Sequence, residues 1–134
     1  MEDWIYLIVA FVVVDIFILI YVFAKGRKKG IPQHERDRLL QHWSKIRVDK
    51  DLKHAVLNAD KLLDEILRIR GYQGPLGEKL KEAESLFANY DGIWKAHKLR
   101  NKIAHELDHR FSEKEARTAI VNFKRAFKDL GLFK

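Results

Sequence analysis

An apolar run near the start of the chain limits the possible fold more than any other feature. From residue 4 to residue 24 every side chain is apolar or aromatic except Asp15. At about 1.5 Å per residue, a helix of this length spans about 30 Å, the hydrocarbon thickness of a bilayer. The start of the chain is acidic, and no small-residue cleavage site precedes the following basic stretch. We therefore expect residues 1–24 to be an uncleaved transmembrane anchor rather than a signal peptide.

The charges that flank this run predict its orientation. No Lys or Arg precedes the run, whereas four basic residues follow it directly: Lys25, Arg27, Lys28 and Lys29. Because basic residues are retained on the cytoplasmic side, we expect a single-pass protein of the inner membrane with its N-terminus outside. Residues 25–33 would form a basic linker close to anionic lipid headgroups, where each Lys or Arg contributes about 1 kcal/mol.

Asp15 is the exception within the apolar run. An aspartate near the bilayer centre costs about 2.5–3.5 kcal/mol on insertion scales. It could mark self-association of the anchor or contact with another membrane protein. The alternative is a single tolerated carboxyl whose cost the surrounding apolar residues offset.

Beyond residue 24 the chain is strongly basic. This part holds all 26 Lys and Arg but 16 of the 19 Asp and Glu, because three acidic residues lie before Lys25, and its net charge is +10. Such a balance favours a polyanionic partner, either RNA or the anionic inner leaflet. The chain has no Cys, which excludes disulfides, thiolate catalysis and Cys-based zinc sites. We predict no cofactor and no metal site.

Apolar residues at three- and four-residue spacing predict successive amphipathic helices in residues 34–134. The expected helices cover about 34–46, 49–70, 78–90 and 93–108, with a last one from Ser112, where Glu115 completes a capping box. The glycine-rich segment 71–77 is expected to be an interhelical loop. No segment is typical of a strand. The sequence thus predicts an all-α protein in which one transmembrane helix precedes a five-helix bundle.

The helix expected at 93–108 carries the polar residues of greatest interest. At 100° per residue, Arg100 lies within the apolar sector of this helix, while His97, Asn101 and His105 follow its edge. An arginine directed at a core needs an anionic partner. Our candidates in the chain are Asp60 and Asp64, which flank the apolar stripe of the helix at 49–70.

The pattern R-N-x-x-x-H at Arg100, Asn101 and His105, after the aromatic and basic segment 94–98, resembles the signature of the HEPN superfamily. HEPN domains are small helical domains, many of which bind or cut RNA, and the resemblance covers residues 34–130. It implies a metal-independent endoribonuclease site, often composed by two subunits, and hence a homodimer. In it His105 would be the general acid or base, Arg100 would hold the scissile phosphate, and Asn101 would orient phosphate or histidine.

Other functions fit parts of the sequence. The bundle could instead be a non-catalytic module that binds RNA, nucleotide or protein, with an antitoxin or a membrane protein as partner. Residues 105–109 also read H-E-x-x-H, a zinc protease pattern with two imidazoles on one helical face. Three features argue against proteolysis. Asp108 is acidic where such proteases usually have an uncharged residue, no third zinc ligand has suitable spacing, and so small a bundle lacks a domain that could form a substrate cleft.

Overall fold

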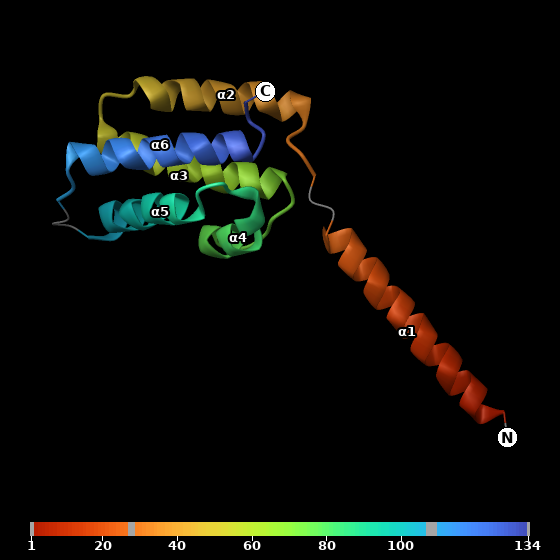
Figure 1. Ribbon diagram of the computed structural model, residues 1–134. Coiled ribbons are helices and arrows are strands. Elements are labelled where there is room, and N and C mark those ends of the chain that lie inside the picture. Colours follow the sequence, from red (N-terminus) through yellow and green to blue (C-terminus); the bar gives the residue numbers. More distant parts are fainter. Residues whose placement is uncertain (1, 27–28, 107–109, 134) are drawn as a thin grey trace.

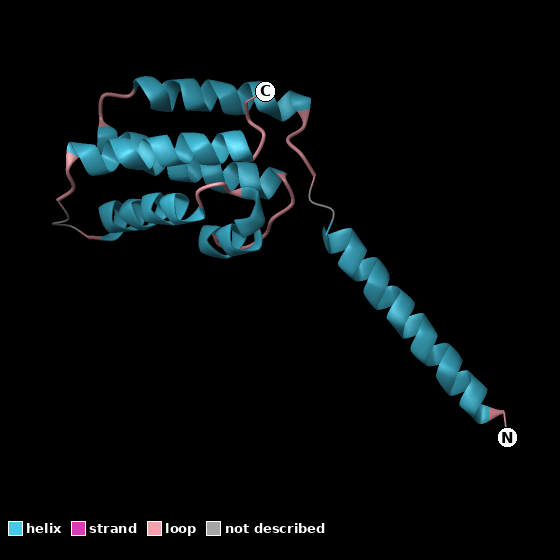
Figure 2. Ribbon diagram, in the orientation of Figure 1, coloured by secondary structure: helices cyan, strands magenta, loops and turns pink. Residues whose placement is uncertain are grey.

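The computed structural model describes residues 2–26, 29–106 and 110–133. Within these ranges the regular structure consists of six α-helices and one short 3-10 helix, with no strand (Figure 2). The elements in chain order are α1 (Asp3–Gly26), α2 (Gln33–Val48), α3 (Leu52–Ile69), α4 (Leu76–Glu82), η1 (Glu84–Leu86), α5 (Tyr90–His105) and α6 (Glu113–Asp129). The prediction of a helical bundle preceded by one apolar helix is confirmed at this level.

Helix α1 stands apart from the other helices (Figure 1). Its segment Asp3–Phe23 is long and apolar enough to cross a membrane, and none of it is buried within the structure. The large apolar side chains of this segment are exposed.

Helix α3 occupies the middle of the bundle and packs against α2, α4, α5 and α6 (Figure 1). The apolar stripes of α3 and α6 meet in the core, where Leu63, Phe123 and Phe127 are fully buried. Trp43 of α2 packs edge-on against Phe127, with ring centroids 5.4 Å apart. The core begins at Ile31 and includes no residue of α1 whose burial the structure describes. The bundle thus has an independent hydrophobic core.

The predicted helix at 78–90 is wrong as a continuous element. Helix α4 ends at Glu82, η1 follows, and α5 already begins at Tyr90. The break occurs because Asn89 caps α5 by accepting a 3.0 Å hydrogen bond from the Gly92 backbone N–H. The Ala88 N–H donates to Asp129 Oδ2 instead of continuing a helix. Asp91 and Gly92, which fall between the predicted helices at 78–90 and 93–108, lie in the first turn of α5.

The C-terminal end of the same helix also differs from the prediction. We expected it to reach Asp108, but α5 ends at His105, and Glu106 has an extended backbone (φ −100°, ψ 111°). Residues 107–109 lie outside the described part of the chain. The last helix begins as predicted, because Ser112 and Glu115 form both hydrogen bonds of a capping box.

Two arginines form hydrogen bonds that hold the N-terminal and C-terminal segments of the bundle together. Arg36 of α2 donates to the carbonyls of Gly131 and Leu132. Arg70, which follows α3, donates to the carbonyl of Leu130 at 3.1 Å and to that of Lys29 at 3.3 Å. The linker from α1 therefore enters the bundle at the end where α6 terminates.

Candidate functional site

A buried carboxylate on α3 organises the polar residues of α5. The side chain of Asp60 is 5% exposed; its Oδ1 lies 2.8 Å from His97 Nδ1 and its Oδ2 lies 3.3 Å from Arg100 Nε. His97 and Arg100 are three residues apart on α5, so both side chains meet α3 on one side. The arginine thus has the internal anionic partner that its position in the helix requires.

His97 is committed to this network. Besides the Asp60 contact, its Nε2 lies 3.4 Å from Asn101 Nδ2, and its ring packs edge-on against Trp94 with centroids 5.8 Å apart. The side chain is buried. His97 therefore holds Asp60 and Asn101 in place and has no free ring nitrogen for a ligand.

Arg100 is only partly satisfied by these neighbours. Its Nη1 donates to Asn101 Oδ1 at 3.1 Å. Its Nε is at ion-pair distance from Asp60, but the N–H does not point along a hydrogen bond, and no other acceptor in the described chain reaches it. The side chain is 34% exposed. A guanidinium has five N–H donors, so Arg100 keeps donors for a further anion.

Arg100 lines an open groove between α3 and α5, with the start of α4 at one end. The groove has a volume of about 980 Å³. Its polar lining consists of Lys53, His54, Asn58, Asp60, Lys61, Asp64, His97, Arg100 and Asn101. Asp60 is occupied as described above, and Asp64 contacts the buried ammonium of Lys79 at 2.8 Å. Lys53 and Lys61 have no such carboxylate in the described structure, so the groove has a surplus of positive charge.

The two carboxylates proposed as partners of Arg100 therefore have different roles. Asp60 contacts Arg100, whereas Asp64 contacts Lys79, whose side chain is only 5% exposed. This second pair fixes α4 against α3, because a buried ammonium needs a compensating anion. Lys79 was not singled out from the sequence, since its position in the predicted helix did not distinguish it from the exposed lysines.

His105 lies elsewhere on α5. It is the last residue of the helix, its side chain is exposed, and it does not line the Arg100 groove. His105 follows Arg100 by five positions, so the two side chains leave the helix axis about 140° apart and about 7.5 Å from one another along it. In one chain the arginine and histidine of the motif do not converge on one point. The side chain of Asn101, in contrast, accepts a hydrogen bond from the Arg100 guanidinium.

In the described part of the chain, the H-E-x-x-H pattern is not helical beyond its first histidine. Because α5 ends at His105, Glu106 is already outside the helix, and His109 lies outside the described residues. The protease pattern requires both histidines on one helical face. Among the residues that the structure describes, no group of three or more His, Asp or Glu side chains is arranged to hold a metal ion.

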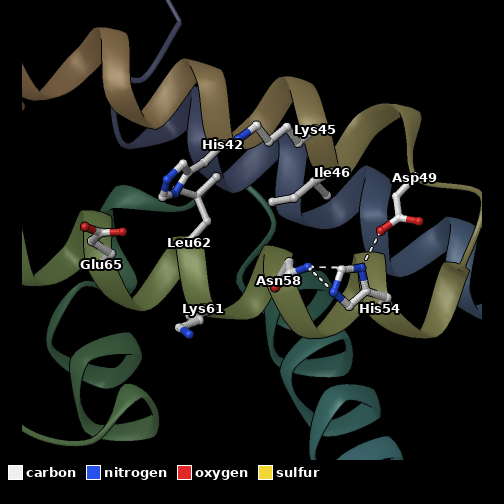
Figure 3. Close-up of a pocket in the computed structure, with 9 residues that line it drawn as sticks. All are labelled: His42, Lys45, Ile46, Asp49, His54, Asn58, Lys61, Leu62 and Glu65. Carbon is white, nitrogen blue, oxygen red and sulfur yellow. Dashed lines mark hydrogen bonds and ion pairs between the residues drawn. The ribbon is translucent and has the colours of Figure 1, made fainter.

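A smaller pocket of about 320 Å³ lies between α2 and α3 (Figure 3). Asp49 and His54 pair with each other, with His54 Nδ1 2.5 Å from Asp49 Oδ2, whereas Glu65 contacts Arg38, which lies outside the pocket lining, at 2.7 Å. The hydrogen bond from His54, helped by one from the Asp51 N–H, lowers the pKa of Asp49 below its ordinary value. The lining also includes Lys45 and Lys61, and Lys61 is shared with the Arg100 groove.

The residues assigned to the membrane region are only partly described. Asp15 lies midway along α1 with an exposed side chain. Lys29 is exposed, and its carbonyl accepts from Arg70. Lys25 lies in the last turn of α1, while Arg27 and Lys28 lie outside the described residues.

Several residues of the groove were not predicted. Lys53 and Lys61 were overlooked because sequence reasoning concentrated on α5. Both are close in sequence to Asp60 on α3, and this proximity was the signal available.

Comparisons with protein-family models, curated proteins and solved structures gave no match.

Proposed function

We propose that this chain is a membrane-tethered, HEPN-like helical domain that binds RNA through its phosphates in the groove between α3 and α5. The observation on which this proposal rests is the state of Arg100. A buried carboxylate holds the guanidinium on one side, while the side chain, 34% exposed and with an Nη hydrogen bond to Asn101, lines an open groove. A planar guanidinium with free N–H groups is well suited to bind phosphate oxygens in pairs.

The surroundings of Arg100 favour an anionic ligand. Asp60 lies on the buried side and is shared with His97, so it fixes the orientation of Arg100 without closing the groove. Lys53 and Lys61 add positive charge along α3. Phosphate contacts of this kind are independent of base sequence and weaken as salt rises. We therefore expect salt-sensitive binding with little base preference.

Cleavage is the further activity implied by the resemblance to HEPN domains. His105 would act as general acid or base, while Arg100 stabilises charge on the phosphate and Asn101 orients the guanidinium. Because His105 leaves α5 in another direction from Arg100, cleavage requires a homodimer in which His105 of a second copy reaches the phosphate. The chemistry would need no metal.

A non-catalytic scaffold is the second candidate, and the internal network of Asp60, His97 and Arg100 favours it. In that function Arg100 fixes α5 to α3, and the exposed surfaces bind a protein such as an antitoxin or a membrane protein. The partial exposure of the Arg100 side chain in the groove favours RNA binding over this alternative.

The proposed membrane tether is helix α1, together with the basic residues that follow it. Its length and composition suit one membrane crossing, and the basic residues that follow it favour a cytoplasmic bundle. Asp15 would then lie near the bilayer centre, where it favours association with a second copy or a membrane partner.

The test is RNA binding by the full chain in nanodiscs of zwitterionic lipid, with excess chelator present. Arg100→Lys retains a positive charge but removes the planar fork, and it is expected to weaken binding at least tenfold. Arg47→Gln, at an exposed position of α2, removes a charge outside the groove and serves as the control. Equal affinities for wild type and Arg100→Lys would refute the proposed site.

Cleavage is measured in the same samples by analysing the ends of the RNA products. We expect any metal-independent cleavage to be lost in both His105→Ala and Arg100→Lys. Mixing these two inactive variants should restore part of the activity if the site is composed by two chains. Binding without cleavage in wild type would leave the domain as an RNA binder.

A further inference from the structure

Helix α5 borders a second groove on its other side, against α6. This groove has a volume of about 430 Å³. Its floor includes the apolar residues Ala96, Leu99 and Ala119. Four exposed lysines line it: Lys95, Lys98, Lys102 and Lys114. We call it the lysine groove.

The spacing of these lysines is what an extended anion requires. Lys95, Lys98 and Lys102 are three and four residues apart, so they lie on one face of α5 over about 10 Å of helix. Lys114 approaches from the first turn of α6. The groove therefore presents a row of positive charges rather than a single site.

The positive charge of this row is not neutralised within the chain. None of the four lysines has a carboxylate at ion-pair distance in the described structure. The one acidic residue of the lining, Glu115, accepts a 2.9 Å hydrogen bond from the Ser112 N–H in the capping box. Like charges on adjacent helical turns repel one another, and a bound polyanion would remove this repulsion.

The lysine groove lies at the end of the bundle away from the linker. The linker joins where Arg70 and Arg36 bind the C-terminal carbonyls after α6. Lys114 is at the opposite end of α6, and sixteen residues of helix correspond to about 24 Å. The position of these lysines therefore favours a ligand in solution over the headgroups near the anchor.

We propose that the lysine groove is a second phosphate-binding subsite, and that one single-stranded RNA crosses α5 from the Arg100 groove to reach it. This inference rests on the RNA-binding function proposed above. On the surface of α5, Asn101 and then His105 lie on the solvent side between Arg100 and Lys98. A strand that takes this path contacts both grooves and passes His105. None of the described residues that line the lysine groove is aromatic, so the groove binds backbone phosphates rather than stacking bases.

The test uses full-length protein in zwitterionic nanodiscs and two oligouridylates, of about 4 and about 16 nucleotides. The double variant Lys98→Gln/Lys102→Gln removes two charges from exposed helix positions, where Gln has nearly the helix propensity of Lys. Lys124→Gln/Lys128→Gln is the control, since these exposed lysines of α6 line neither groove. Affinity is measured as a function of salt for both RNAs.

For the longer RNA, we expect the lysine-groove variant to reduce the slope of log K against log salt by about 1.4, since each phosphate contact contributes about 0.7. This corresponds to about 25-fold weaker binding at 0.1 M salt. The short RNA, held in the Arg100 groove, should change less than twofold. Lys98→Arg/Lys102→Arg should restore binding of the longer RNA.

Distinct results would overturn the two proposals. If wild type binds RNA and Arg100→Lys weakens binding, but the lysine-groove variant matches its control, the second subsite is refuted and the first stands. The same conclusion follows if the variant loses affinity only for vesicles of anionic lipid. If wild type binds neither RNA, the proposed function fails, and the second subsite fails with it.

Discussion

Replacing Asp60 by asparagine tests whether the buried carboxylate holds Arg100 electrostatically. Asparagine has the same shape, and its oxygen can still accept a hydrogen bond from His97. The group that faces Arg100 is then an uncharged amide instead of a carboxylate. At 3.3 Å, the Coulomb energy of the pair is about 1 kcal/mol with the dielectric of water and about 5 kcal/mol with an effective dielectric of 20. Because Arg100 is 34% exposed, solvent screening favours the lower part of this range.

We therefore expect Asp60→Asn to lower the free energy of unfolding by about 2–3 kcal/mol. Of this, about 1–2 kcal/mol is coupling to Arg100, and the remainder is the weaker hydrogen bond to His97. The assay is urea denaturation of the bundle from Lys29 onward, followed by circular dichroism, since the core begins at Ile31. Measuring the substitution again in an Arg100→Gln background isolates the coupling.

The matched control is Glu113→Gln, which removes one charge of an exposed pair with Arg117 on α6. Pairs of this kind contribute about 0.3–0.5 kcal/mol. The reasoning is refuted if Asp60→Asn costs no more than this control. It is also refuted if the cost is the same with Arg100 present and absent, because the carboxylate would then not be acting on the guanidinium.

Three further predictions concern stability and titration. The lowered pKa of Asp49 means that its pair with His54 stabilises the fold above the ordinary aspartate range and loses this contribution as pH falls through the folded value; carboxyl-carbon NMR should show the pKa rising in His54→Ala, and an unchanged pKa would contradict the assignment. Gly92→Ala should destabilise the bundle by about 1 kcal/mol in urea, because a Cβ would lie 2.4 Å from Asn89 Nδ2 and displace the cap; a stabilised variant would show that helix propensity dominates. Ser112→Ala should lower the melting temperature through loss of the capping box, at a cost of about 1 kcal/mol, and an unchanged melting temperature would count against that contribution.

Local features of the sequence were sufficient for most of the helical architecture. The apolar run of α1 and the apolar stripes of α3 and α6 follow from residue spacing alone, and the start of α6 follows from its capping box. These signals are local because helix periodicity and N-caps involve residues within one or two turns. The segment 78–90 was mispredicted because its breaks depend on Asn89 and on Asp129, which lies far along the chain.

The arrangement of the candidate site depended on tertiary structure. By itself the sequence placed Arg100, His97 and Asn101 on neighbouring parts of one helix and gave Arg100 two possible partners, Asp60 and Asp64. These two carboxylates are four residues apart and share a face of α3, so only the axial offset between α3 and α5 determines that Asp60 contacts Arg100 while Asp64 contacts Lys79. Helix periodicity assigns a residue to a face, whereas pairing between helices depends on how the packed side chains set their register.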